Sequence, residues 1–145
     1  MIALLQRVTR ASVSINGERT AAIGPGLMVL LGVEKNDIPE QAERLVKKLL
    51  GYRVFADDEG KMNQSVLDID GGILLVPQFT LAADTGSGLR PGFSAAASPE
   101  QGADLFALVV DIMRLRVPQL QTGKFGADMA VELINDGPVT FWLQV

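Results

Sequence analysis

The 145-residue sequence contains neither cysteine nor histidine. Without cysteine there is no disulfide, no thiolate nucleophile and no thiolate ligand for a metal ion. Without histidine the chain lacks the side chain that most often serves as a general base and as a zinc ligand. Composition alone therefore excludes catalysis of the Ser-His-Asp and Cys-His types, and any catalytic function must use other groups.

Long apolar runs and an excess of positive charge are also absent. No apolar segment reaches the roughly 18 residues that a membrane-spanning helix needs. The segment MIALLQRVTR places Arg7 and Arg10 after its apolar residues, the reverse of a signal peptide. We therefore expect a cytoplasmic protein with no membrane partner. The net charge of -4 disfavours binding to an extended nucleic-acid surface, so any contact with RNA should be local.

The composition is that of one folded domain covering residues 1–145, with 48% hydrophobic and 21% charged residues. Residues 4–15 alternate towards their end in a way that predicts a strand. Asn16-Gly17 is a strong hairpin signal, with the partner strand expected at residues 19–23. The apolar run LMVLLGV, residues 27–33, suits a strand buried on both faces.

Two segments have the periodicity of amphipathic helices, and each begins at a capping signal. Asp37 three positions before Glu40 resembles a capping box, with Pro39 in the first turn. Ser98 followed by Pro99 marks the start of the second helix. The apolar residues at helical spacing are Ala42, Leu45, Val46, Leu49 and Leu50 in the first helix, and Ala103, Phe106, Val109, Val110 and Met113 in the second.

Further strands are expected at residues 52–55, at ILLVPQF (residues 73–79), and at residues 129–134 and 139–145. The Gly-, Ser- and Ala-rich residues 82–97 are predicted to form a long loop, and loops of this length in a compact domain are usually functional. Strands and helices alternate without repeats or linkers. The order predicts an α/β fold with a mixed or mainly antiparallel sheet.

Charged clusters give weak signals. The acidic run Asp57–Glu59 fits no oxygen-ligand spacing, so we interpret it as a solvated turn and expect no metal site. Arg44, Lys47 and Lys48 lie on one surface of the first helix. They can contact a phosphate backbone or form an ordinary solvated helix face, and the pattern favours the second interpretation.

Two segments stand out at predicted strand ends. Pro77–Leu81 lies where a buried strand stops, because proline donates no hydrogen bond to a sheet. Composition alone predicts an ordinary strand terminus there with a buried Phe79. Gly137-Pro138 is predicted to form a turn between the last two strands. Most peptide bonds before proline are trans, so the residues alone favour a trans bond here.

These two segments, PQFTLAAD and NDGPVTFWLQV, resemble the two signature motifs of the D-aminoacyl-tRNA deacylase family, in the family's order and separation. Four further segments are similar to the same family: QRVTRASV, GYRVFADDEGKMN, RPGFSAAASP and TGKFGADM. The resemblance thus covers essentially the whole chain. It implies a homodimer of single α/β domains, each with a barrel-like sheet and two main helices.

The resemblance implies hydrolysis of the ester that joins a D-amino acid, or mischarged glycine, to the 3′ end of tRNA. It also implies a cis bond at Gly137-Pro138, and insertion of this motif into the active site of the other subunit. Rigid backbone there excludes L side chains by collision. The resemblance further implies that the 2′-hydroxyl of the terminal adenosine assists the attack, so we expect positioning to do much of the catalysis and no cofactor to be needed.

Residue roles follow from the same resemblance. Gln78, Phe79 and Thr80 are the expected catalytic segment, and the N–H groups of Phe79 and Thr80 are candidates to stabilise the oxyanion. Phe125 and Met129 are expected to line the adenosine pocket. Arg7 is expected to hold the incoming glycine–proline turn.

One departure from the family pattern is Pro77, which stands where the family motif has serine. It removes that serine as a nucleophile and leaves Thr80 as the only side-chain hydroxyl in the motif, with no evident base beside it. Two alternatives therefore stand beside a D-aminoacyl-tRNA deacylase. One is a non-catalytic nucleic-acid-binding homologue, and the other is a relative with a trans glycine–proline bond that edits L-alanyl-tRNA.

Overall fold

In the computed structural model, which describes residues 1–145, strands and helices follow one another in the predicted order. The sheet strands are β1 (Ile2–Ile15), β2 (Glu18–Ile23), β3 (Gly26–Gly32), β6 (Gly72–Pro77), β7 (Leu120–Thr122) and β8 (Ala130–Gln144). The helices are α1 (Pro39–Gly51), the 3₁₀-helix η1 (Phe79–Ala82) and α2 (Pro99–Arg114). The short strands β4 (Phe55–Ala56) and β5 (Met62–Gln64) form a separate hairpin.

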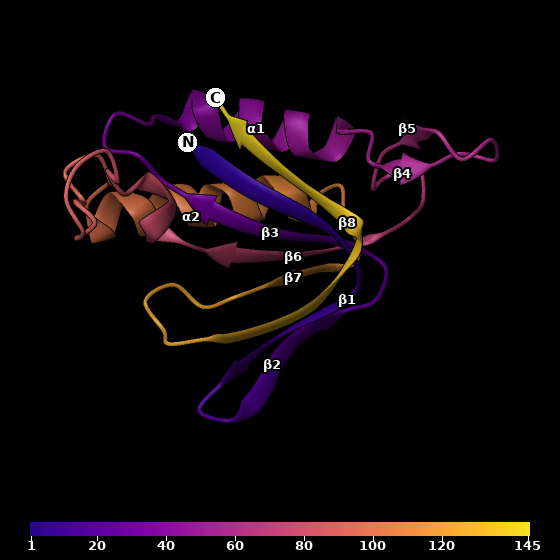
Figure 1. Cartoon of the computed structure of the whole chain (residues 1–145), viewed down its shortest axis with the longest axis horizontal. Helices are drawn as coiled ribbons and strands as arrows, with labels where there is room; N and C mark the ends of the chain where they lie inside the picture. Colours follow the sequence, from indigo (N-terminus) through magenta and orange to yellow (C-terminus); the bar gives the residue numbers. More distant parts are fainter.

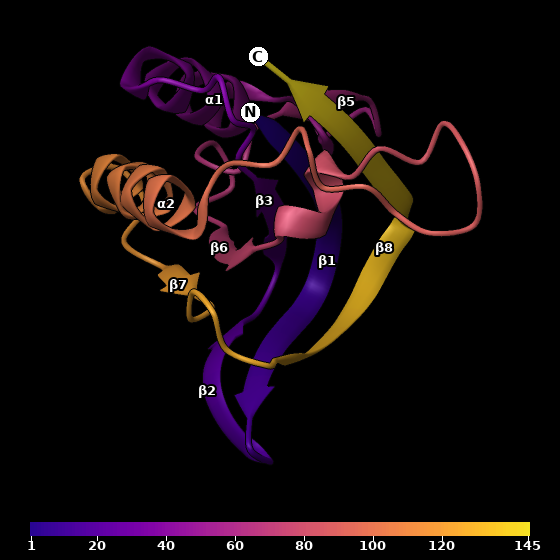
Figure 2. The same cartoon turned by 90° about the vertical axis from the view of Figure 1, so that its left-hand side faces the viewer.

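The main sheet is mixed and strongly curled. Its order is β2-β1-β3-β6-β7, with β8 on the other edge of β1. β3, β6 and β7 are parallel, and the remaining pairs are antiparallel. Both helices lie on one face, while the β1–β2 hairpin folds away from them (Figure 1 and Figure 2). The expected single α/β domain with a barrel-like mixed sheet and two main helices is confirmed.

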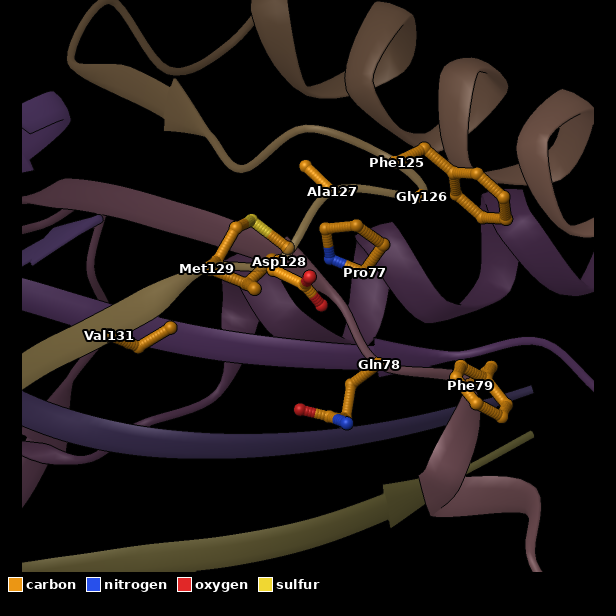
Figure 3. A pocket seen from close by; sticks show the side chains of 10 residues that line it. Pro77, Gln78, Phe79, Phe125, Gly126, Ala127, Asp128, Met129 and Val131 are labelled. Atoms are coloured by element: carbon orange, nitrogen blue, oxygen red, sulfur yellow. The ribbon is translucent and has the colours of Figure 1, made fainter. Parts of the chain in front are cut away.

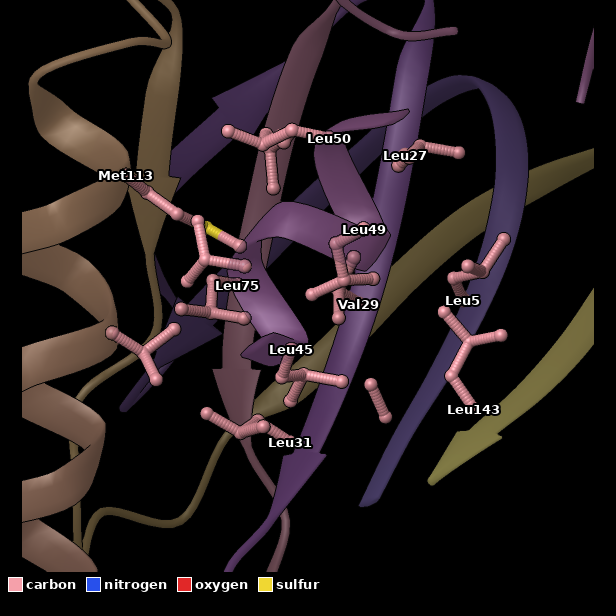
Figure 4. Close-up of a cluster of buried hydrophobic side chains, with 14 of the residues drawn as sticks. Leu5, Leu27, Val29, Leu31, Leu45, Leu49, Leu50, Leu75, Met113 and Leu143 are labelled. Atoms are coloured by element: carbon pink, nitrogen blue, oxygen red, sulfur yellow. The ribbon is translucent and has the colours of Figure 1, made fainter. Parts of the chain in front are cut away.

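The apolar strands β3 and β6 are buried on both faces, as the run of residues 27–33 predicts. One set of their side chains, including Val29 and Leu75, packs under α1 and α2 in the larger core (Figure 4). The alternate set, including Met28 and Leu74, fills a smaller core inside the curled sheet. Because successive strand residues point to opposite faces, two strands contribute to both cores at once.

The predicted hairpin and helices are present. Asn16 and Gly17 have φ of +52° and +78°, the conformation of a two-residue hairpin turn. α1 buries the five predicted apolar residues and no others. In α2 the buried face includes Gly102 and Leu105, whereas Ala103, predicted to be on it, is half-buried. Neither helix combines the length and the apolar character needed to cross a bilayer.

The capping prediction is right for α2 and wrong for α1. Ser98 Oγ accepts a hydrogen bond from the Gln101 N–H at 3.2 Å, as predicted. At α1 the N-cap is Ile38, whose N–H donates to the Gln41 side chain at 2.9 Å. Asp37 instead accepts from the N-terminal ammonium at 2.6 Å, a partner far away in the sequence.

Two strand predictions are corrected near the segments of interest. β6 ends at Pro77, and Phe79 begins a 3₁₀-helix instead of extending the strand. The C-terminal residues form one strand, β8, and not two strands joined by a turn. Both halves of β8 pair with β1, so the intervening residues 136–139 are accommodated as a bulge opposite Arg7. We call residues 136–139 the β8 bulge.

Substitution of Gly26 tests the pairing of β3 with β6. A Cβ at Gly26 would lie 1.9 Å from the Gly72 carbonyl oxygen, a backbone atom that no side-chain rotation can move. We expect Gly26→Ala to lower the free energy of unfolding by about 3 kcal/mol or more. Urea denaturation measures this, and Gly24→Ala is the control because nothing lies within 4 Å of its Cβ position. Equal stability of the two variants would contradict the tight pairing.

Candidate active site

The chain changes direction directly after β6. Pro77 is the last strand residue, paired with Leu31 of β3. The Gln78 N–H still donates to the Leu31 carbonyl at 2.7 Å, and η1 then begins. Within a 3₁₀-helix the first N–H groups have no carbonyl partner, so those of Phe79 and Thr80 are free of the helix's own bonding. The Phe79 side chain is 60% exposed, contrary to the buried position expected from composition.

A cavity of about 330 Å³ opens beside this turn, between the end of β6 and the loop that leads into β8. Figure 3 shows Pro77, Gln78 and Phe79 leaving β6 along one side, with Met129 and Val131 contributed from the β8 side. The lining residues are Val76, Pro77, Gln78, Phe79, Phe125, Gly126, Ala127, Asp128, Met129 and Val131. We call this the first cavity.

A second cavity of about 270 Å³ lies beneath the start of α2 and shares part of its wall with the first. The shared residues are Pro77, Gln78, Phe79, Phe125 and Gly126. Phe125 packs against Phe106 of α2, with ring centroids 6.3 Å apart. A Cβ at Gly102 would lie 3.2 Å from the Phe125 ring, so the helix approaches the ring closely because this residue has no side chain.

Met129 is held at the mouth of the smaller core. The Lys124 N–H donates to its sulfur at 3.3 Å. Met129 also packs against the smaller core, to which Val76 belongs. At Gly123 a Cβ would lie 2.8 Å from the same sulfur and 3.2 Å from Pro77 Cδ. The first cavity is therefore the opening of the barrel interior, with Met129 across it from the end of β6.

The hydroxyl next to the first cavity is not activated. Thr80 Oγ1 accepts a hydrogen bond from the Gln78 side-chain amide. An amide is not a base, so it does not take up the proton of an attacking hydroxyl. Asp128 is the one carboxylate in the cavity lining, and its side chain faces Pro77 and Gln78 (Figure 3). What the site offers is mainly backbone donors, aromatic surface and shape.

The carboxyl groups whose pKa is shifted from its ordinary value lie outside both cavities. Partial burial raises the pKa of Glu34, but hydrogen bonds from the N-terminal ammonium and from Gln144 hold it below its ordinary value. Bonds from the Asn63 side chain and the Lys61 N–H lower the pKa of Asp57. The Asp57 bonds join the predicted solvated turn to the start of β5. No group of three or more acidic side chains gathers at a position that could hold a metal ion.

Arg7 holds the β8 bulge of its own chain. Its Nε donates to the Asp136 carbonyl at 3.1 Å and lies 3.2 Å from the Asp136 carboxylate. Its Nη1 donates to the Val54 carbonyl at 2.7 Å. The Gly137-Pro138 peptide bond is cis, and Gly137 has φ of +132°. Both residues are exposed, so the bulge presents its tip to the surroundings.

The structure gathers part of the predicted site in one place. Four of the expected residues line the first cavity: Gln78, Phe79, Phe125 and Met129. Thr80 lies beside it, bonded to Gln78. Arg7 and Gly137-Pro138 lie together at the β8 bulge and do not line either cavity.

Sequence reasoning missed three residues of the site. Asp128 gives no sequence signal beyond its place in the segment GADM. Gly102 and Gly123 create room for Phe125 and Met129. Gly102 had a usable signal, because a glycine inside a helical pattern is disfavoured against alanine and so indicates a packing reason.

Comparison with known proteins identifies the family of the chain. The family described as D-Tyr-tRNA(Tyr) deacylase matches residues 4–144. The chain belongs to this family. A relative from Herminiimonas arsenicoxydans, named D-aminoacyl-tRNA deacylase, is 64% identical over 145 residues, covering 100% of this chain and 97% of the relative. Another of that name, from Enterobacter sp. (strain 638), is 57% identical and covers 100% of both chains.

A solved structure is also similar over its full length. The protein is described as c-Myc DNA Unwinding Element Binding Protein and is 42% identical to this chain. The TM-score is 0.96, with 100% of this chain and 99% of the other covered. The fold, with its curled sheet, is thus shared with that protein.

The Gly102–Phe125 contact can be tested by substitution. Alanine is a better helix former than glycine, so we expect Gly102→Ala to raise the free energy of unfolding, by less than about 1 kcal/mol. The added Cβ should displace the exposed Phe125 ring and change both cavities. Denaturation and a crystal structure of the variant measure the two effects. Ala107→Gly, at an exposed position of α2, calibrates the propensity effect. An unmoved Phe125 ring would refute the close contact.

Proposed function

We propose that this protein hydrolyses the ester of D-aminoacyl-tRNA, releasing the free D-amino acid and tRNA. Full-length relatives at 64% and 57% identity carry that name. The observation that carries the proposal is the end of β6, where the N–H groups of Phe79 and Thr80 lie beside a cavity lined with aromatic and thioether side chains. The cavity suits a terminal adenosine, because aromatic faces stack on a base without reading its sequence.

The proposed mechanism relies on the substrate for its reactive hydroxyl. The 2′-hydroxyl of the terminal ribose assists a water molecule in attacking the carbonyl carbon of the ester. The C–O bond to the 3′ oxygen then breaks, and that oxygen takes up a proton. The Phe79 and Thr80 N–H groups stabilise the negative charge on the carbonyl oxygen. The arrangement supports this because Thr80 bonds an amide and has no base beside it.

Selection against L-amino acids is assigned to the β8 bulge of a second subunit. We propose that Gly137-Pro138 enters the active site of the partner in a homodimer, where its backbone occupies the space of an L side chain. Both residues are exposed, and Arg7 donates a hydrogen bond to the Asp136 carbonyl, which supports a β8 bulge that is rigid and projects from the surface. Glycine has no side chain to exclude, so glycyl-tRNA is also accepted.

A homodimer in the cytoplasm fits the surface of the chain. β8 pairs along one edge only, with β1. Ile134 and Trp142 on the same strand are 45% and 51% exposed. Large apolar side chains on an exposed strand commonly mark an association surface. The proposed substrate, aminoacyl-tRNA, is used by ribosomes in the cytoplasm, so we place the protein in that compartment.

A second candidate function is nucleic-acid binding without catalysis. A structure 42% identical to this chain is described as a DNA-unwinding-element-binding protein. Pro77 also removes the serine and one N–H donor from the family motif. This candidate predicts tRNA binding with no turnover, and recovery of turnover in Pro77→Ser. A third possibility, editing of L-alanyl-tRNA, predicts turnover of that substrate in preference to D-aminoacyl-tRNA.

Deacylation of matched D-tyrosyl-, L-tyrosyl-, L-alanyl- and glycyl-tRNA by the wild type and Thr80→Ala tests the proposal. We expect the wild type to clear the D- and glycyl-tRNAs and spare the L-aminoacyl-tRNAs. Thr80→Ala should keep its rate within about tenfold of the wild type, because loss of a true nucleophile costs about 10⁴-fold or more. Intact D-tyrosyl-tRNA under conditions where a control deacylase removes it would refute the proposal, and a 10⁴-fold loss in Thr80→Ala would refute the mechanism.

Gly137→Ala tests the role of the β8 bulge. A Cβ there would lie 2.7 Å from the Val139 side chain and 3.0 Å from its backbone nitrogen, at a φ that L residues rarely adopt. We expect distortion of the bulge, with discrimination between D- and L-tyrosyl-tRNA reduced about tenfold. Gly60→Ala is the control, since Gly60 also has positive φ but no atom within 4 Å. Unchanged discrimination in a folded Gly137→Ala variant would argue against the proposed role.

A further inference from the structure

An open groove of about 580 Å³ lies between α1 and the end of β8. Three basic side chains line it: Arg44, Lys47 and Lys48. The positions i, i+3 and i+4 lie on one helix face within about one turn, 5.4 Å of helix. We call this the α1 groove. Neither cavity of the candidate active site includes any of its residues.

The three basic side chains of the α1 groove have no ion-pair partner within the protein. Arg44, Lys47 and Lys48 are exposed, and none forms a salt bridge, whereas Arg7, Arg10 and Lys61 each do. No aspartate or glutamate lines the groove, and the main-chain oxygen of Val145, the last residue in its lining, already accepts a hydrogen bond from the N-terminal ammonium at 3.2 Å. A chain with a net charge of -4 thus keeps an unpaired basic surface in one place.

The remaining lining adds neutral hydrogen-bonding groups. Tyr52 and Gln144 contribute a phenol and an amide. Gln144 donates to the Glu34 carboxylate at 3.1 Å, and that carboxylate is already bound by the N-terminal ammonium at 2.8 Å. The Glu34 carboxylate beside the lining is therefore compensated by the ammonium. Cationic side chains with neutral donors between them are the usual means of holding phosphate groups.

The α1 groove begins at the same end of the sheet as the candidate active site. β3, β6 and β8 run in one direction, so their C-terminal ends lie together. Pro77 ends β6 at the first cavity, and Gln144 ends β8 at the groove. A nucleic acid whose 3′ terminal nucleotide occupies the cavity has the nucleotides on its 5′ side at this end of the molecule.

We propose that the α1 groove binds the phosphate backbone of the tRNA acceptor stem while the 3′ end is in the active site. This rests on the proposed function, because it requires tRNA as the substrate. The groove contributes to affinity through charge, without reading sequence, and takes no part in the chemical step. It also reconciles an acidic protein with an RNA substrate, since few phosphate contacts suffice when they are concentrated.

The test compares two triple variants with equal loss of charge. The groove variant is Arg44→Gln, Lys47→Gln, Lys48→Gln. The control variant is Arg19→Gln, Arg114→Gln, Arg116→Gln, three exposed cations that form no salt bridge and line neither cavity. Each is assayed on D-tyrosyl-tRNA and on 3′-O-(D-tyrosyl)adenosine, which carries the ester and the nucleoside but no phosphate.

We expect the groove variant to lose about tenfold in kcat/KM on the tRNA, with kcat unchanged, and to keep wild-type turnover of the adenosine ester. The slope of log(kcat/KM) against log salt should become shallower by about two to three, one for each lost phosphate contact. The control variant should stay within about twofold of the wild type on both substrates. Equal behaviour of the two variants on tRNA, or an equal loss on both substrates, would overturn the proposal.

Binding of uncharged tRNA separates this proposal from the proposed function. If the wild type hydrolyses neither ester, the deacylase function fails, and binding still tests the groove. A loss of about tenfold in affinity for the groove variant alone supports the proposal. Affinity equal to that of the wild type overturns it and leaves the groove to a protein or a small anion.

Discussion

Parallel pairing of β3 with β6 begins where Gly26 meets Gly72 and ends where Leu31 meets Pro77. The approach at the first pair is too close for a Cβ, which holds the two strands in a single register. That register decides which residue is the last to pair, and hence where the chain turns into η1. The N–H groups beside the first cavity are therefore positioned by backbone packing between two cores, and not by side chains of their own.

A site built in this way needs neither of the residues that the sequence lacks. Backbone donors do not titrate, so they keep their function without a tuned base. Their cost is geometric, because the cavity must be kept in shape by residues that contribute no chemistry. Gly102 and Gly123 do this by leaving room for Phe125 and Met129, and Lys124 fixes the Met129 sulfur through its N–H.

Local patterns were enough to predict α1, α2, the Asn16-Gly17 hairpin and the strands β1, β3 and β6, because periodicity and turn chemistry are properties of neighbouring residues. The short strand β7 was not predicted. Predictions failed where a distant partner decided the outcome. The sequence predicts Asp37 as a helix cap, but its carboxylate accepts a hydrogen bond from the N-terminal ammonium, 36 residues away. The full-length resemblance pointed to segments that line the first cavity, while the exposure of Phe79 and the joining of two predicted strands into β8 depend on how the sheet closes.

The neck of the β8 bulge is closed by a single side chain. Asn135 donates to the Thr140 hydroxyl at 2.8 Å and accepts from the Val139 N–H at 3.0 Å. One amide thus spans the residues between the two paired halves of β8. The length of this segment is therefore tightly constrained, because an inserted or deleted residue would separate Asn135 from both partners and shift the downstream half of the strand to the wrong face of the sheet.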